Sequence, residues 1–308
     1  MIGTPIKMEK ELIALIREKG PLTGSQIKND LDEDSFILWQ TCRRSKKLAI
    51  KRVGTRYLRL DKRVDGFARL SPSILREFLT YSVIGLAAEP GPVSRKVREI
   101  ASHIKKVSKD KLDLGYSIIS GVRKQIGSAW KDSYQVCFVI AGDIVYNMAH
   151  DVPRPEHSTG RLVNGSDIDL IVVLEDKLSE DFRKRLDDSI YQEKYRILTS
   201  PSMKEEVDYI VKRLSRVKEQ VQFRTFKDMV ACKILQEGML LYGSELLFAN
   251  IKSLLHEHGV TARLDKLEKQ ARFFRKNAEK HLLDASPEEV KNESLYLFYT
   301  SEETEEFE

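Results

Sequence analysis

The sequence predicts an α+β protein in which an α/β-type core lies between an N-terminal module and a C-terminal helical region. Two runs with the pattern of buried strands, QVCFVIAG (135–142) and IDLIVVLE (168–175), alternate with segments of helical periodicity, which is typical of such a core. From Phe223 onward, apolar residues recur at helical spacing until the acidic tail SEETEEFE. We expect four parts, which are residues 1–63, a helical connector 64–109, the core 110–222 and the helical region 223–308.

Composition and charge fit a globular protein in a reducing compartment. The 308 residues are 41% apolar and 32% charged, with a formal net charge of +5, which is typical of a chain that folds around its own cores. The three cysteines are isolated and form no CxxC pair, so neither a disulfide framework nor a zinc site is expected. The N-terminus carries charges through its first apolar stretch, and no apolar run is long enough to cross a membrane. We therefore expect a cytoplasmic protein with no membrane partner.

The first 63 residues show the element order of a winged helix-turn-helix. Three helical patterns and two strand patterns follow one another, at 7–19, 24–31, 35–46, 48–53 and 56–60. Thr23 is the expected N-cap of the second helix. Gly54 marks a turn that would join the two strands as a β-hairpin. Residues 71–86 are expected to form a further helix in the connector.

Positive charge is concentrated at the end of the third predicted helix and along the predicted hairpin. Between residues 43 and 63 there are ten Lys or Arg residues and one acid, Asp61. These elements meet the phosphate backbone in DNA-binding modules of this kind, so nucleic acid is the expected partner. The candidate contacts are Arg43, Arg44, Lys46, Lys47, Lys51, Arg52 and Arg56. The alternative is a module that packs on the rest of the protein and leaves its basic face in solvent.

The core carries acids at the point where a buried strand begins. Asp167 and Asp169 are two residues apart, so their side chains share a face if the backbone is extended. Two adjacent carboxylates repel each other unless a cation lies between them, and Mg²⁺ prefers such oxygen ligands together with a substrate phosphate. Asp208 lies on a third predicted strand, EEVDYIVKR (205–213). If the two strands are neighbours, the three acids form a site that can hold two metal ions for in-line displacement at phosphorus.

This arrangement resembles the nucleotidyltransferase superfamily of the DNA polymerase β type. The resemblance covers roughly residues 110–250 and rests on three segments that follow a strand ending in glycine: GSDIDLIVVLED (165–176), VDYIV (207–211) and KILQEGMLLYGSELL (233–247). It implies a mixed sheet flanked by helices, Mg²⁺ (or Mn²⁺) as cofactor, an NTP substrate and transfer of a nucleoside monophosphate to a hydroxyl acceptor. It further implies that Asp167 and Asp169 are metal ligands and that Asp208 is the third catalytic carboxylate, as a metal ligand or base.

The chain departs from this family at the end of the first core strand, where the family has a Gly-Ser pair that holds the nucleotide phosphates. The corresponding residues are Gly142 and Asp143, and an anion beside a triphosphate is unfavourable without compensation. Candidates for the phosphate contacts are Arg154, Arg161, Gly165 and Ser166. The two arginines would offset the charge of Asp143, and the other pair directly precedes the acids. A third possibility is a domain that binds a nucleotide and has lost catalysis.

Two functions are therefore expected. The first is a Mg²⁺-dependent nucleotidyltransferase whose N-terminal module binds nucleic acid. The alternative is a DNA-binding regulator with a catalytically inactive, nucleotide-sensing nucleotidyltransferase-like domain. The resemblance also suggests a partner protein of a toxin–antitoxin or defence system, by analogy alone. Several polar residues near these motifs are expected to be solvated rather than functional, namely His150, His157, Glu206, Arg275 and His281.

Overall fold

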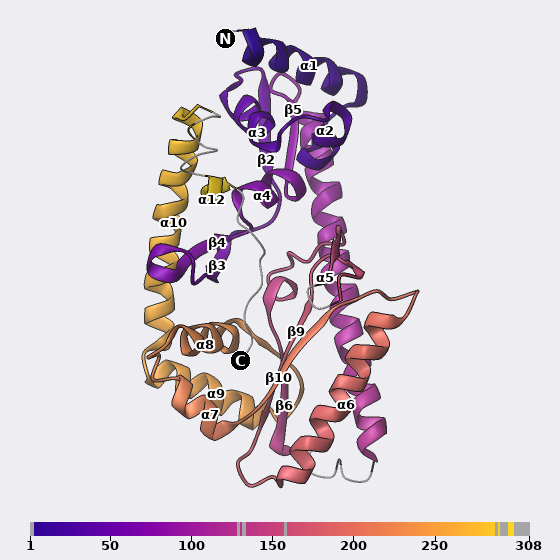
Figure 1. The fold of residues 1–308 in the computed structure, drawn as a ribbon, viewed down its shortest axis with the longest axis vertical. Coiled ribbons are helices and arrows are strands. Elements are labelled where there is room, and N and C mark those ends of the chain that lie inside the picture. The colour runs from indigo at the N-terminus through magenta and orange to yellow at the C-terminus, as the bar shows by residue number, and fades with distance from the viewer. Residues whose placement is uncertain are drawn as a thin grey trace. The chain divides into compact units, whose positions relative to one another are not determined.

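The computed structural model describes residues 3–127, 130, 134–156, 159–286, 289 and 295–298, so His157 and the acidic tail lie outside the described residues. It is a mixed α/β protein in which the strands form several small sheets, in agreement with the predicted α+β class (Figure 1). The chain divides into two compact units, the first built from residues up to 103 and from 267 onward, the second from residues 104–266. The division falls inside two helices, α5 (Pro90–Ile126) and α10 (Val260–Asp284). None of the described helices is both long and apolar enough to cross a membrane.

The first unit begins with three helices in the predicted places. They are α1 (Gly3–Lys19), α2 (Gly24–Leu31) and α3 (Ser35–Arg44). Thr23 caps α2 as predicted, because its hydroxyl accepts a hydrogen bond from the backbone nitrogen of Gln26 and its own backbone nitrogen donates to the Gln26 side chain. Asp34 caps α3 in a similar way by accepting from two backbone nitrogens of the first turn.

The predicted β-hairpin over residues 48–60 is wrong, because its two strands have other partners. The first strand, β2 (Leu48–Arg52), pairs antiparallel with β5 (Ser82–Leu86), with Ile50 opposite Ile84. The same β5 also pairs antiparallel with β1 (Leu22–Thr23), so the sheet order is β1–β5–β2. The long segment between β2 and β5 therefore replaces the tight turn expected at Gly54.

That segment contains a separate hairpin and a short helix. The strand β3 (Tyr57–Leu60) pairs antiparallel with β4 (Ala68–Ser71), and α4 (Ile74–Thr80) follows. The helix predicted over 71–86 thus ends early. Val83 and Ile84 are both fully buried, and such β-branched residues fit a central strand better than the end of a helix. Residues 68–86 of the expected helical connector accordingly form β4, α4 and β5.

Residues near the C-terminal end of the chain complete the core of the first unit. The side-chain amide of Gln40 on α3 donates a hydrogen bond to the carbonyl of Leu282 near the end of α10, at 2.9 Å. In the short helix α12 (Leu295–Phe298), Phe298 is fully buried and packs edge-on against Phe36, with ring centroids 5.3 Å apart. The first unit is therefore assembled from both ends of the chain.

The second unit contains the core sheet, in the order β10–β9–β6–β11. The strands are β6 (Val136–Ile140), β9 (Ile168–Leu174), β10 (Val207–Arg213) and β11 (Met239–Gly243). The first three confirm the strands predicted from the sequence; β9 runs parallel to β10 and antiparallel to β6. The fourth lies where a helix was predicted. There α8 (Phe226–Glu237) ends at Gly238, and the following residues pair with β6.

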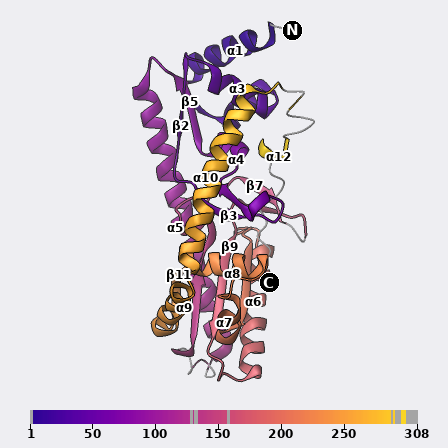
Figure 2. The same ribbon diagram turned by 90° about the vertical axis from the view of Figure 1, so that its left-hand side faces the viewer.

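Helices cover both faces of this sheet. On one face, α5 and α6 (Glu180–Thr199) share a core with alternate residues of the strands, such as Phe138 and Leu170. On the other side lie α8 and two further helices, α7 (Leu214–Gln220) and α9 (Glu245–Glu257) (Figure 1), and Figure 2 views the unit from this side.

The chain between β6 and β9 forms the rim of the sheet. It contains the 3₁₀ turn η3 (Gly142–Ile144) and a small hairpin of β7 (Pro153–Pro155) with β8 (Leu162–Asn164). Because β6 is antiparallel to β9, and β9 is parallel to β10, the C-terminal end of β6 meets the N-terminal ends of the other two strands. The predicted site residues of the core lie around this rim.

Candidate active site

Three carboxylates meet at the N-terminal ends of β9 and β10. Asp167 directly precedes β9, Asp169 is its second residue, and the parallel register places Asp208 of β10 opposite Asp169. One carboxylate oxygen from each residue lies within 4.8 Å of the other two. The predicted adjacency of the two strands is confirmed, and it brings the three acids together as the spacing in the sequence suggested.

The donor set of this cluster suits a hard divalent cation. All three ligands are carboxylate oxygens, which Mg²⁺ prefers, and two oxygens on opposite sides of an octahedral Mg²⁺ are about 4.2 Å apart. The three carboxylate oxygens, which lie at most 4.8 Å apart, would therefore need to move only slightly closer together to bind one ion. Asp169 is buried, whereas about a third of the side chain of Asp167 (35%) and of Asp208 (31%) is exposed. Water and a substrate phosphate can thus reach the open side of the cluster.

Gly142, which the sequence placed at the phosphate-binding turn, lies directly against Asp169. Its φ is +69°, in the left-handed region that favours glycine. A Cβ atom built on Gly142 would overlap with Oδ2 of Asp169, so the backbone reaches closer to the carboxylate than any other residue would permit. The backbone nitrogen of Ala141 donates to the carbonyl of Asp169 at 3.1 Å, which holds the turn in register with β9.

A buried charge network behind this turn escaped the sequence analysis. The Glu237 carboxylate at the end of α8 accepts from the backbone nitrogen of Gly142 (3.4 Å), from the Tyr146 hydroxyl (2.7 Å) and from the ammonium of Lys233 (2.9 Å). The side chains of both Lys233 and Glu237 are buried. The only signal in the sequence is the four-residue spacing of a Lys and a Glu on a predicted helix, which usually indicates an exposed pair. Here the pair ties α8 to the Gly142 turn.

Asp143, the residue that departs from the family pattern, is hydrogen-bonded to Ser166. The Ser166 hydroxyl donates to Oδ2 of Asp143 at 2.7 Å. The same hydroxyl accepts from the backbone nitrogen of His150, and the backbone nitrogen of Ser166 donates to the His150 carbonyl. The Ser166 hydroxyl therefore lies next to the Asp143 carboxylate and connects the Gly142 turn to the loop that precedes β9.

His150 and Gly165 determine the shape of the loop that precedes β9. His150 is buried, so the expectation of a solvated histidine is wrong; its Nδ1 accepts from the backbone nitrogen of Val152 at 3.2 Å. Gly165 has a φ of +64°, and a Cβ there would overlap with the carbonyl of His150. The loop before the acid pair is thus fixed by close backbone packing.

Of the two arginines proposed to contact phosphates, the structure brings one to the cluster. Arg154 donates from Nε to the carbonyl of Gly165 (2.7 Å), and its guanidinium lies 3.7 Å from Oδ2 of Asp167 and 2.8 Å from Oε2 of Glu206. Arg161 lies on the same loop, but its side chain is exposed. Arg154 therefore touches the acids themselves, where it offsets part of their mutual repulsion.

Glu206 and Lys194 extend the cluster on either side of Asp208. Glu206 is buried, so the prediction of a solvated acid is wrong. Burial raises the pKa of its carboxyl to about 7, and neighbouring Asp208 adds to the rise while Arg154 opposes it. Lys194 on α6 donates to Oδ1 of Asp208 at 3.1 Å. No sequence pattern indicated this contact, because Lys194 is one of many charged residues on that helix.

The predicted nucleic-acid contacts of the first unit fall into two groups. Arg56 is half-buried and donates from both sides of its guanidinium to Glu77 (2.6 Å) and to Glu279 (2.7 Å). Arg44 donates to the carbonyl of Leu283 at the end of α10, and Arg43 lies 3.8 Å from Glu279. Arg56 is therefore partly internal, whereas Arg43 and Arg44 contact residues of α10 but remain exposed.

The other basic residues of that surface also face solvent. They are Lys46, Lys47, Lys51 and Arg52, at the end of α3 and along β2. Lys47 makes an exposed ion pair with Glu9 at 3.8 Å. The expectation that Arg275 is a surface residue is wrong, because it is buried and lies between Glu77 (3.4 Å) and Glu279 (2.7 Å). His281 is exposed, as expected.

The chain was compared with models of known protein families and with curated proteins, and none of them matches it.

Proposed function

We propose that the protein is a Mg²⁺-dependent nucleotidyltransferase that transfers a nucleoside monophosphate from an NTP to a hydroxyl acceptor. The observation that carries the proposal is the convergence of Asp167, Asp169 and Asp208 at the ends of two adjacent parallel strands, directly beside the glycine turn at Gly142. Carboxylates in this arrangement hold divalent ions, and such ions would neutralise the triphosphate and lower the pKa of the attacking hydroxyl. The resemblance of the sequence motifs to the DNA polymerase β type supports the same core fold.

Each residue of the site would have a distinct role in this reaction. Asp167 and Asp169 would hold the metal that binds the triphosphate, and Asp208 would ligate the second metal or accept the proton of the acceptor hydroxyl. The Gly142 turn would let the phosphates approach the backbone, with Ser166 supplying the hydroxyl that the family places next to the glycine. Arg154 is close enough to exchange its contact with Asp167 for one with a phosphate oxygen.

The test is incubation with each labelled NTP, Mg²⁺ or Mn²⁺, and RNA, DNA or protein acceptors, followed by measurement of label transfer and pyrophosphate release. We expect activity in the native protein and none above background in the Asp167→Asn, Asp169→Asn double variant. Asp110→Asn is the matched control, because this exposed acid on α5 pairs with Lys106 and lies outside the carboxylate cluster. Failure of all four NTPs to give label transfer or pyrophosphate with any acceptor contradicts the proposal.

Metal binding can be tested without knowing the acceptor. Titration with Mn²⁺, followed by electron paramagnetic resonance, should show binding that the double variant loses and Asp110→Asn retains. Equal Mn²⁺ affinity in the native protein and the double variant would show that the acids are not the ligands.

The first unit supports a role in nucleic-acid binding. Its three helices and its sheet order β1–β5–β2 are compatible with a winged helix in which residues 53–81 are inserted between the two strands of the wing. Lys46, Lys51 and Arg52 are exposed and available for phosphate contacts. Duplex DNA affinity should fall steeply with salt, and the slope should decrease in a Lys51→Ala, Arg52→Ala variant, whereas Arg56 variants should lose stability instead.

A second candidate function is a DNA-binding regulator that senses a nucleotide without turnover. The observation that favours it is Asp143, whose carboxylate stands in the phosphate-binding turn and accepts from Ser166. This candidate predicts NTP binding in calorimetry and a change in DNA affinity on adding NTP, both without pyrophosphate release. DNA binding that is unchanged by saturating NTP would count against it.

A further inference from the structure

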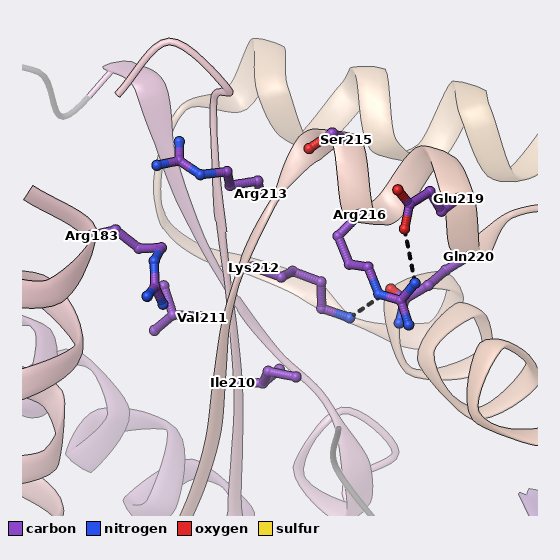
Figure 3. A pocket seen from close by; sticks show the side chains of 9 residues that line it. All are labelled: Arg183, Ile210, Val211, Lys212, Arg213, Ser215, Arg216, Glu219 and Gln220. Atoms are coloured by element: carbon purple, nitrogen blue, oxygen red, sulfur yellow. Dashed lines mark hydrogen bonds and ion pairs between the residues drawn. The ribbon is translucent and has the colours of Figure 1, made fainter. Parts of the chain in front are cut away.

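The second unit has a pocket around the C-terminal half of β10, at the other end of this strand from Asp208 (Figure 3). The strand β10 is the outermost strand of the described sheet. The pocket has a volume of about 360 Å³, within the range of small-molecule sites, which is roughly 300–1,000 Å³. Lys212 follows Asp208 by four residues, which corresponds to ~13 Å along a strand. The pocket is therefore distinct from the carboxylate cluster.

The floor of the pocket contains a buried lysine without a counter-ion. Lys212 is 7% exposed, and its ammonium donates to Oε1 of Gln220 on α7 at 3.1 Å. Figure 3 shows the two side chains pointing toward each other on one side of β10. Among the described residues, no carboxylate forms an ion pair with Lys212. A cation buried in this way is unfavourable unless an anion reaches it.

Gln220 adds a second donor to the floor. It is 1% exposed, and because its Oε1 accepts from Lys212, its amide nitrogen Nε2 is directed elsewhere. This nitrogen is buried and has no hydrogen-bond partner within the described part of the chain. A buried donor without a partner is costly, so its presence points to an acceptor supplied from outside. Lys212 and Gln220 together offer positive charge and free N–H groups.

The three arginines at the rim of the pocket already contact acids, and together they share two carboxylates. Arg216 lies 2.9 Å from Glu219, and Arg213 lies 3.0 Å from Glu180. Arg183, on the other side of β10, also pairs with Glu180. Among the described cations that line the pocket, Lys212 is therefore the one that contacts no carboxylate.

We propose that this pocket binds a phosphate group, free or as the monoester of a small organic molecule, through Lys212 and Gln220. A phosphate brings both the negative charge that Lys212 lacks and several oxygen acceptors, so one oxygen can accept from the ammonium while another accepts from Nε2. The proposal does not depend on nucleotidyl transfer, because no residue of the carboxylate cluster takes part.

Calorimetry on the full chain, in EDTA so that no metal links a phosphate to the acids, tests the site. The probes are inorganic phosphate, AMP and adenosine. Binding of phosphate and AMP but not of adenosine is expected. Equal affinity for the first two identifies the phosphate group itself as the ligand, whereas tighter binding of AMP indicates a monoester. If neither phosphate nor AMP binds, the proposal is overturned.

Two variants separate this site from other positive surfaces. Lys212→Met should weaken phosphate binding roughly tenfold to a hundredfold, the value of a charge-assisted hydrogen bond. Gln220→Glu should abolish binding, because it places a carboxylate against Lys212 and so supplies the missing anion from within the protein. Lys218→Met is the matched control, since Lys218 is exposed on the same helix, and should bind as the native protein does. Undiminished phosphate affinity in either floor variant overturns the proposal.

Discussion

Replacing Lys212 by Met is expected to stabilise the second unit at neutral pH, although it removes a hydrogen bond. Burial lowers the pKa of Lys212 from 10.5 to about 8, and each tenfold change in proton affinity corresponds to ~1.4 kcal/mol. The buried ammonium therefore costs about 3 kcal/mol at pH 7. Met has a similar length and no charge, but it leaves the Gln220 oxygen without its donor, which costs about 1 kcal/mol. The expected net gain in unfolding free energy is about 2 kcal/mol.

The pH dependence gives the sharper test. A lowered lysine pKa means that the unfolded state binds the proton more tightly, so the penalty on the native state is complete below pH 8 and disappears as pH rises toward 10.5. The advantage of the Met variant should thus shrink by about 2 kcal/mol between pH 7 and 9.5. Three buried thiols whose pKa values burial raises to about 12 act in the opposite direction, but both proteins share them.

Urea unfolding at the two pH values measures this difference. Trp39 reports on the first unit and Trp130 on the second, so a Trp39→Phe background lets the fluorescence follow the second unit. A Met variant whose stability relative to the native lysine is the same at both pH values would refute the argument, because an uncharged role for Lys212 has no such pH dependence.

Three further changes test other parts of the structure. Gly142→Ala should abolish Mn²⁺ binding and lower activity strongly, because the added Cβ displaces the Asp169 carboxylate; Mn²⁺ titration and circular dichroism distinguish this loss from misfolding. Lys252→Met should change the unfolding free energy at pH 7 by less than about 1 kcal/mol in urea titration, because the loss of three hydrogen bonds to carbonyl oxygens at the end of α8 offsets the removal of a charge whose pKa burial lowers to about 8. Arg56→Met should cost about 3–5 kcal/mol by the same measurement, since it leaves Glu77 partly buried without its main partner; a change of less than 1 kcal/mol would place Arg56 among the surface contacts instead.

The strands β6 and β9 could be predicted because their residues are buried on both faces. Every residue of β9 is buried, and such continuous apolar runs bounded by polar loops are distinctive in a sequence. The strand β11 was missed because its residues, Met239–Gly243, are apolar at positions that also fit a helix. The feature hardest to predict from the sequence was which strands pair with each other. The partner of β2 lies beyond a separate hairpin and a helix, and local turn signals such as Gly54 carry no information about so distant a strand.

In the site, too, the features set by local sequence could be predicted, and those set by distant segments of the chain could not. The convergence of Asp167, Asp169 and Asp208 follows from strand periodicity and from the parallel pairing of two neighbouring strands. The roles of Glu237 and Glu206 depend on burial by segments far away in the chain, and an isolated acid in a sequence gives no measure of that burial. The sequence therefore predicted the residues at the centre of the cluster, and not those that set their environment.

The first unit is built from two segments that are far apart in the chain, and this has a consequence for how the chain folds during synthesis. Domains generally fold in the order in which they leave the ribosome, but Leu282 and Phe298, which complete the core of the first unit, emerge after the second unit. The second unit is continuous in the chain and is finished earlier. We therefore expect the second unit to become native first. Until Leu282 and Phe298 are synthesised, the helices at the start of the chain remain without these packing partners, and Phe36 and Gln40 stay exposed. During that interval the nascent N-terminal segment is the part most open to chaperones and proteases.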